Sequence, residues 1–156
     1  MPRRAEIQPR ELAPDPVHNS MLVSQVINRV MTMGKKSTAE RIVYDALAIA
    51  AERSGKTPVE VLEQAIKSVT PVMETRSRRV GGANYQVPVE VPARRARTLA
   101  IRWIVTFSRE RREKGMAAQL AGELLDALEQ QGGAFKRKDD LYRMAQANKA
   151  FAHYRW

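Results

Sequence analysis

The sequence predicts an all-α, mainly helical fold: a bundle of six helices, a protruding two-stranded β-hairpin between the third and fourth helices, and an extended basic arm at the N-terminus. Apolar residues recur at helical spacing through most of the 156 residues. Residues 72–91 instead alternate as strands do, around a glycine turn. Residues 1–18 are too polar and too rich in proline to fold alone. With 44% hydrophobic residues, the chain suits a single domain, 1–156.

The N-terminal arm, residues 1–18, carries Arg3, Arg4 and Arg10 between prolines. In the free protein it could be a floppy terminus, whereas on RNA such an arm folds by laying its arginines along phosphates. It lacks the apolar stretch of a signal peptide, and its prolines forbid the amphipathic helix of a transit peptide. We therefore expect it to stay on the mature protein.

The first two helices are expected in residues 20–55. The first covers 20–33, where apolar residues fall on one helical face, and Gly34 stands where a left-handed C-terminal cap belongs. The second opens on a capping box of Ser37 and Glu40, in which each side chain bonds the other's backbone N–H. It is expected to end near Gly55.

Lys35 and Lys36 lie between these helices. A lysine at a helix start opposes the helix dipole, so the pair indicates an external anion. A solvated turn explains it equally well. The surrounding MGKKS stretch is not a nucleotide-binding P-loop, because no strand precedes it and Arg29 stands in place of the first glycine.

Thr57 and Glu60 form a second capping box, around a proline at the first helical position, for a third helix that ends near Thr70. The fifth helix begins after Gly115 and has no row of basic residues, so we interpret it as scaffold packed against the fourth. The glycines at 132–133 are expected to end it, and a sixth helix follows.

Residues 72–91 predict a β-hairpin with a well-specified turn. Gly81, Gly82 and Asn84 tolerate positive φ, and valines alternate along the second limb. Two prolines make that limb an edge, and an isolated ribbon is marginal in water, so we expect a polyanion to pack on it. The alternative is a solvated hairpin whose arginines prevent aggregation. These arginines are Arg76, Arg78 and Arg79.

The fourth helix, residues 93–114, has two opposite faces at about 100° per residue. One face, interpreted as core, collects Ala96, Leu99, Ala100, Trp103, Ile104 and Phe107. The other holds the arginine rail, defined as Arg95, Arg102 and Arg109, with Arg94 and Arg112 beside it. Acids at i±4 are nearly absent along the rail, which favours phosphate contact over a solvated face.

Basic residues cluster in the middle of the chain. From Arg76 to Lys114 there are eleven lysines and arginines against three acids, so this quarter contributes +8 to a net charge of +10. Solubility does not require such clustering, whereas phosphate binding does. The expected partner is nucleic acid, with an anionic membrane as the weaker option.

Other function classes find little support. There is no cysteine, and His18 and His153 are far apart, so a zinc site or a His-centred triad has few possible members. We expect no enzyme activity and no cofactor. No apolar run reaches the about 18 to 20 residues that span a bilayer, so we expect a cytoplasmic protein without a membrane partner.

Residues 143–156 form the C-terminal helix and aromatic tail. Flat rings and a guanidinium within six residues could stack on unpaired bases, or the rings could dock on the core; the residues favour neither. The tail residues are Phe151, His153, Tyr154, Arg155 and Trp156.

Three long stretches resemble the family of ribosomal protein seven of the small subunit. They are GGANYQVPVEV followed by ARRARTLAIRW (81–91 and 93–103), DPVHNSMLVSQVINRVMTMGKKSTAERIVYDAL (15–47) and MAQANKAFAHYRW (144–156). They follow the order that the family has, and a chain that stops at Trp156 resembles its short bacterial type.

This resemblance implies a structural constituent of the small ribosomal subunit, a primary binder of small-subunit ribosomal RNA that nucleates the head, close to the transfer RNA exit site and the messenger RNA path. It implies a monomer within the subunit, with neighbouring proteins of the head and platform, exit-site transfer RNA and messenger RNA as partners. Some members repress translation by binding messenger RNA that mimics the ribosomal site. The implied ribosomal RNA contacts are Arg3, Arg4, Arg10, Lys35, Lys36, Arg76, Arg78, Arg79, Arg94, Arg95, Arg97, Arg102 and Arg109. The residues implied near the exit site or messenger RNA are Gly81, Gly82, Ala83, Asn84 and Arg143.

The residues by themselves leave a rival of another class, a regulator that reads duplex DNA with a short helix. Such a protein needs a sharp helix-turn-helix pair and usually a dimer, whereas here the charge lies on an arm, a hairpin and a long helix. Folded RNA is therefore the favoured partner, and an enzyme is a distant third.

Overall fold

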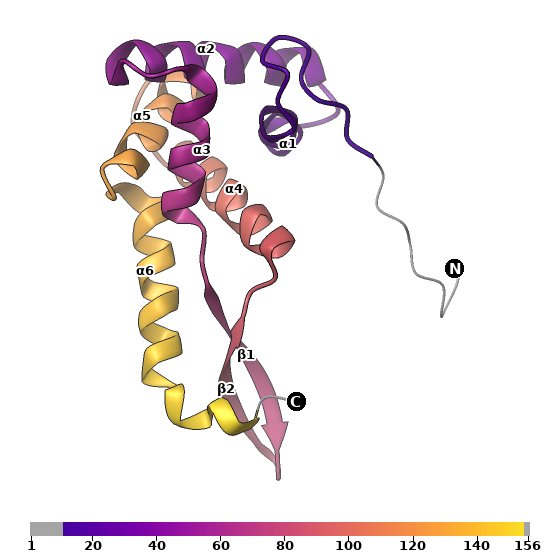
Figure 1. The fold of residues 1–156 in the computed structure, drawn as a ribbon, viewed down its shortest axis with the longest axis vertical. Coiled ribbons are helices and arrows are strands. Elements are labelled where there is room, and N and C mark those ends of the chain that lie inside the picture. The colour runs from indigo at the N-terminus through magenta and orange to yellow at the C-terminus, as the bar shows by residue number, and fades with distance from the viewer. Residues whose placement is uncertain (1–10, 155–156) are drawn as a thin grey trace.

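A computed structural model of the chain describes residues 11–154 (Figure 1). The elements are α1 (Met21–Val30), α2 (Lys36–Ser54), α3 (Pro58–Val69), β1 (Met73–Val80), β2 (Ala83–Glu90), α4 (Ala93–Arg109), α5 (Met116–Leu128), α6 (Gly132–Ala147) and the 3-10 helix η1 (Lys149–Tyr154). The mainly helical fold with an antiparallel hairpin between α3 and α4 is confirmed. Within the described range, no helix is both long and apolar enough to cross a membrane.

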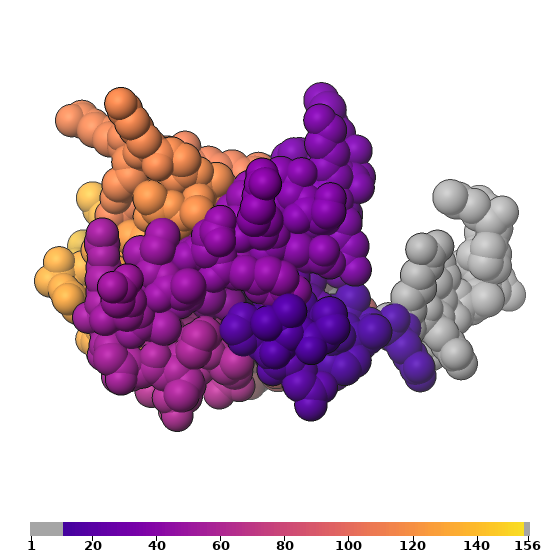
Figure 2. Space-filling model, turned by 90° about the horizontal axis from the view of Figure 1, so that it is seen from above, coloured from indigo at the N-terminus to yellow at the C-terminus, as the bar shows by residue number. Residues whose placement is uncertain are grey.

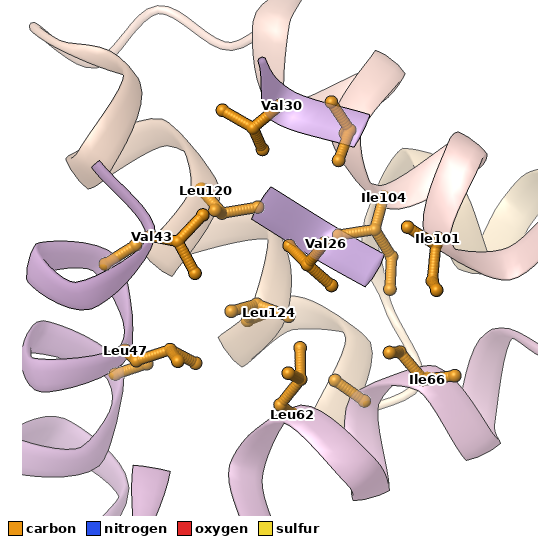
Figure 3. Close-up of a cluster of buried hydrophobic side chains, with 14 of the residues drawn as sticks. Val26, Val30, Val43, Leu47, Leu62, Ile66, Ile101, Ile104, Leu120 and Leu124 are labelled. Carbon is orange, nitrogen blue, oxygen red and sulfur yellow. The ribbon is translucent and has the colours of Figure 1, made fainter. Parts of the chain in front are cut away.

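Five helices share one apolar core. Side chains from α1 to α5 converge in it (Figure 3), and those labelled there are Val26, Val30, Val43, Leu47, Leu62, Ile66, Ile101, Ile104, Leu120 and Leu124. Helix α5 lies in the middle, in contact with α2, α3, α4 and α6, which confirms it as scaffold. Each fully buried aliphatic side chain contributes about 1.5 to 3 kcal/mol, so this core is the main source of stability.

The ends of α2 and α3 are as the sequence predicts. Gly55 ends α2 with φ at 67°, in the left-handed region that glycine tolerates. At the start of α3, the Thr57 hydroxyl accepts from Glu60 N at 3.4 Å, and the Glu60 carboxylate accepts from Thr57 N at 3.2 Å. The predicted second capping box is therefore present.

The boundary between α1 and α2 was predicted wrongly. Helix α1 ends at Val30, and the chain turns through Met33 and Gly34, whose φ angles are 51° and 73°, so Gly34 belongs to the loop and is not the helix cap. Ser37 lies inside α2, which begins without a side-chain cap. Glu40 does not complete a capping box but pairs with Lys36 one turn earlier, at 3.6 Å, which partly offsets the lysine at the helix start.

The glycines at 132–133 begin α6 and do not end α5, contrary to the prediction. A Cβ on Gly133 would lie 2.7 Å from Phe107 Cδ1, so glycine permits α6 to start directly against α4. The buried Glu123 carboxylate accepts from Ala134 N at 2.8 Å and serves as the cap of α6. This capping residue comes from α5, where no local sequence rule would seek it.

The hairpin, hereafter the ribbon, extends away from the bundle with α6 beside it (Figure 1). Its register runs from Met73 opposite Glu90 to Val80 opposite Ala83, and the two turn glycines have positive φ, as predicted. The premise that the ribbon is isolated is wrong, because α6 packs against β1 and η1 packs against β2. The polyanion that was expected to pack on it stays a prediction.

The aromatic tail docks on the ribbon. The ring of Tyr85 on β2 lies 5.1 Å from that of Phe151 and 5.3 Å from that of Tyr154, in tilted contacts that favour aromatic pairs. These two tail rings therefore pack within the protein, although on the ribbon and not in the bundle core. The last two tail residues, Arg155 and Trp156, lie outside the described residues.

Part of the predicted arm belongs to the fold. Its arginines at positions 3, 4 and 10 lie outside the described residues. From Asp15 on, the chain belongs to the fold and lies along the flank of α3 (Figure 2). Asp15 is 2% exposed and accepts hydrogen bonds from the Tyr44 hydroxyl at 2.5 Å, from His18 N at 3.0 Å and from Val17 N at 3.2 Å.

Removal of the Tyr44 hydroxyl tests this anchor. Burial by itself would raise the pKa of Asp15, but the bonds from Tyr44, His18 and Val17 hold it below its ordinary 3.8. The bond to Asp15 and burial raise the pKa of Tyr44 to about 12. We expect Tyr44→Phe to lower the free energy of unfolding near pH 7 by about 1.5 to 3 kcal/mol, as measured by urea unfolding, since a buried carboxylate loses a donor.

The sign of the pH dependence follows from the two shifts. The wild-type advantage should be full between about pH 4 and pH 10. It should disappear as the pH falls through the lowered pKa of Asp15, or rises through the raised pKa of Tyr44. Tyr142→Phe is the control, because this residue is half-exposed and its hydroxyl accepts from Gln146 alone within the described part of the chain. Its cost near pH 7 should stay within about 0.5 kcal/mol. Equal costs for the two variants would contradict the anchor.

Candidate nucleic-acid interface

A groove of about 590 Å³ lies between α1 and the first half of α4. Four arginines and two side-chain amides line this α1–α4 groove, and no acid does. The arginines are Arg29, Arg94, Arg97 and Arg102. All four are exposed, and within the described part of the chain none of their guanidinium groups has a hydrogen bond or an ion pair. Four like charges in a groove whose lining holds no acid create a positive potential, which attracts anions.

The arginine rail divides between two situations. Arg102 faces the α1–α4 groove without a protein partner among the described residues. Arg95 Nε lies 2.9 Å from a Glu74 carboxylate oxygen, and Arg109 Nη2 donates to Val30 O at the end of α1, at 3.2 Å. Arg95 and Arg109 therefore each donate an N–H to a partner within the protein. These partners are too distant in sequence for the helical pattern of α4 to reveal.

Glu74 joins the root of the ribbon to α4. This carboxylate is 6% exposed and binds Arg95 and also Arg76, at 2.7 Å. Burial would raise the pKa of Glu74, but its hydrogen bonds to Arg95 and Arg76 outweigh burial and keep it below the ordinary value. Each guanidinium has five N–H donors, so both arginines keep donors for a phosphate.

A second cluster removes Arg111 from the positive surface. Its Nη2 lies 2.8 Å from Glu113, and its Nη1 lies 2.6 Å from Asp126 and 3.0 Å from Glu123. The bond to Glu113 and those to Asp126 and Glu123 raise the pKa of Arg111, although burial opposes them. Arg111 contributes one positive charge to the net charge of the sequence, but three acids neutralise it in the structure. Its bonds to Glu123 and Asp126 tie the α4–α5 loop to α5.

The buried face of α4 is rotated from the predicted one. Trp103 and Phe107, expected at its centre, are only partly buried and pack at the edge of the core. The reason is that α1 and α5 cover the side of α4 next to the one predicted. The buried residues of α4 are Ala96, Ala100, Ile101, Ile104, Val105 and Ser108.

The other predicted contact residues lie at separate places. Lys35 and Lys36 are exposed at the start of α2, at the end of the molecule away from the ribbon (Figure 1). Arg79 is exposed on β1, Arg78 is half-buried there, and residues 81–84 form an exposed tip. Arg143, on α6, forms an exposed ion pair with Asp139 at 2.7 Å. Among the contact residues in the described range 11–154, the structure thus brings together the groove arginines and, through Glu74, the root of the ribbon.

The sequence comparisons decide the family. The family model described as Ribosomal protein S7p/S5e matches residues 2–149. The chain belongs to the ribosomal protein S7p/S5e family. Relatives named "Small ribosomal subunit protein uS7" are 60% identical in Rubrobacter xylanophilus and 58% identical in Dictyoglomus thermophilum and in Rhodococcus opacus. Each match covers 156 residues, 100% of both chains.

Membership in the S7p/S5e family makes this chain a structural constituent of the small ribosomal subunit and not an enzyme, as the sequence predicted. It places the chain on the ribosome in the cytoplasm, and it decides against the DNA-binding regulator. The family does not by itself say which side chains meet RNA.

Sequence reasoning missed the polar face of α1. Gln25, Asn28 and Arg29 line the α1–α4 groove, opposite Arg94 and Arg97 of α4. The signal was available in their spacing, since residues at i, i+3 and i+4 share one side of a helix. It was overlooked because α1 was interpreted only through its apolar residues.

Neutralising Glu74 tests the joint between ribbon and α4. We expect Glu74→Gln to lower the free energy of unfolding at pH 7 by about 1 to 3 kcal/mol, because an amide cannot neutralise two guanidinium groups. The wild type should lose this advantage as the pH falls through the lowered pKa of Glu74. Urea unfolding at pH 7 and pH 3 measures it, with the exposed Glu52→Gln on α2 as the matched control. A cost no larger than that of the control would show that the ion pairs do not stabilise the joint.

Proposed function

We propose that this chain is a primary binder of small-subunit ribosomal RNA, which nucleates the head of the subunit and holds folded RNA through its phosphates and shape. The observation that carries the proposal is the α1–α4 groove, where four exposed arginines gather without an acid. By contrast, Arg95 and Arg111 each form ion pairs with acids of the protein. Arginines left without partners are available to phosphate oxygens, which they bind in bidentate fashion.

The ribbon supplies a second contact region, which extends from the start of α4 away from the bundle (Figure 1). Arg79 and the exposed tip at residues 81–84 extend it beyond the bundle. Packing on α6 and η1 holds the ribbon in place, so binding does not have to order it first. We propose that the tip and Arg143 lie near the transfer RNA exit site and the messenger RNA path, as the family resemblance implies.

The finer parts of the proposal follow from the same surface. The N-terminal arginines would extend the contact with ribosomal RNA, and neighbouring proteins of the head and platform would adjoin a chain that acts as one domain and one copy per subunit. A messenger RNA that folds like the ribosomal site would compete for the same arginines. Translational repression by this chain is therefore part of the proposal.

A salt titration tests whether the groove arginines meet phosphates. The variant carries Arg94→Ala, Arg97→Ala and Arg102→Ala, which should preserve the fold because alanine favours helix and no partner is lost. If each arginine neutralises one phosphate, the slope of log K against log salt for small-subunit ribosomal RNA should become shallower by about 0.7 to 0.9 per arginine, or about 2 to 3 in all.

The control removes the same charge elsewhere, by Arg41→Ala, Arg53→Ala and Arg137→Ala, three exposed residues of α2 and α6 outside the groove. Long-range attraction is similar for both triple variants and is largely screened at physiological salt. Equal slopes for the two variants would mean that the groove does not touch the RNA backbone. The interface would then have to be sought on the ribbon and the N-terminal arm.

A further inference from the structure

We infer that the α1–α4 groove receives one unpaired nucleotide of the RNA, and that Gln25 and Asn28 read the edge of its base. This inference rests on the proposed function and deepens it, because it names the kind of RNA element that the groove recognises. The groove arginines bind phosphate whatever the sequence, whereas base contacts carry the sequence information.

Two rows of side chains face each other across the groove. On α1, Gln25, Asn28 and Arg29 stand at i, i+3 and i+4. On α4, the facing row has the same helical spacing of three or four residues. It consists of Arg94, Arg97, Thr98, Ile101 and Arg102. The volume of about 590 Å³ lies within the range of about 300 to 1,000 Å³ that is usual for small-molecule sites. A single nucleotide is a ligand of this class.

The two amides distinguish a base from a phosphate. A phosphate oxygen only accepts hydrogen bonds, and the four arginines already offer it ample donors. Gln25 and Asn28 each add an acceptor as well as donors, and the edge of a base presents both. Neither amide has a hydrogen-bond partner within the described part of the chain, and Gln25 is half-buried in the groove wall.

The groove also has an apolar part that a flat ring can cover. Leu12, Ala93 and Ile101 line it; Ala93 is exposed and Leu12 is half-buried, whereas Ile101 is almost fully buried beneath them. Base faces are apolar, and unpaired bases in RNA-binding sites stack on side chains, guanidinium planes included. The groove thus combines apolar surface, base-reading amides and phosphate-binding arginines. An acidic peptide could also use the arginines, and its backbone could bond the amides, so the competition described below separates it from a base.

The test compares Gln25→Ala/Asn28→Ala with Gln64→Ala/Gln146→Ala. The control pair lies on α3 and α6 outside the groove, where both amides are exposed and have protein partners. Each variant is titrated over a range of salt with small-subunit ribosomal RNA, and with a fully paired RNA duplex that offers no unpaired base. Helicity and the urea midpoint are checked first, and alanine at these helix positions should preserve both.

We expect the groove variant to bind the ribosomal RNA about tenfold more weakly or worse, with an unchanged salt slope and unchanged affinity for the duplex. The control should bind like the wild type. A loss below twofold for ribosomal RNA, or an equal loss for the duplex, would overturn the inference. The proposed function fails separately, if the wild type itself binds ribosomal RNA no better than the duplex.

A competition identifies an acidic peptide as the occupant if the inference is wrong. Polyglutamate is added to the complex of ribosomal RNA with the wild type or the groove variant. If the amides read a base, polyglutamate should compete with the RNA through charge alone. Its affinities for the wild type and for the groove variant at low salt should then agree within twofold. Markedly weaker polyglutamate binding to the groove variant would show that the amides recognise carboxylates, and would reject the base-reading role.

Discussion

An apolar core shared by five helices is the interaction on which the rest of this structure depends. The chain carries a net charge of +10 and leaves the four arginines of the α1–α4 groove without acids, so mutual repulsion opposes the folded state. Burial of valine, leucine, isoleucine and alanine side chains from α1 to α5 has to exceed that repulsion. The small side chains let the helices approach closely, so much apolar surface is removed from water in a domain of modest length.

Three buried acids fix parts of the architecture. Glu74 joins the ribbon to α4, Glu123 begins α6 and binds Arg111, and Asp15 anchors the segment before α1. Each is buried, and each has several hydrogen-bond partners. Because none of them lines the α1–α4 groove, the same folding pattern that satisfies the acids leaves the groove positive. The positions of these buried acids therefore stabilise the fold and also leave the α1–α4 groove positively charged.

Local patterns predicted most of the elements. Long-range contacts account for several of the errors, whereas the boundary between α1 and α2 and the polar face of α1 are errors of local reasoning. The Thr57–Glu60 box and the left-handed Gly55 are local devices, and both are confirmed. The partners of Arg95 and Arg109 come from other elements, which no helical periodicity can reveal. The same holds for the docking of the aromatic tail on Tyr85. The groove combines α1 and α4, so its arginines could be predicted one by one but not as a site.

The salt dependence of stability tests most directly whether the groove arginines are left unpaired at a cost to the fold. Urea unfolding of the free protein is followed at about 0.02 M and about 0.5 M sodium chloride, where screening lengths differ several-fold. The wild type should become more stable in the higher salt, and the variant without Arg94, Arg97 and Arg102 should gain clearly less. A wild type that loses stability in the higher salt, or gains no more than this variant, would show that the groove charges are compensated within the protein.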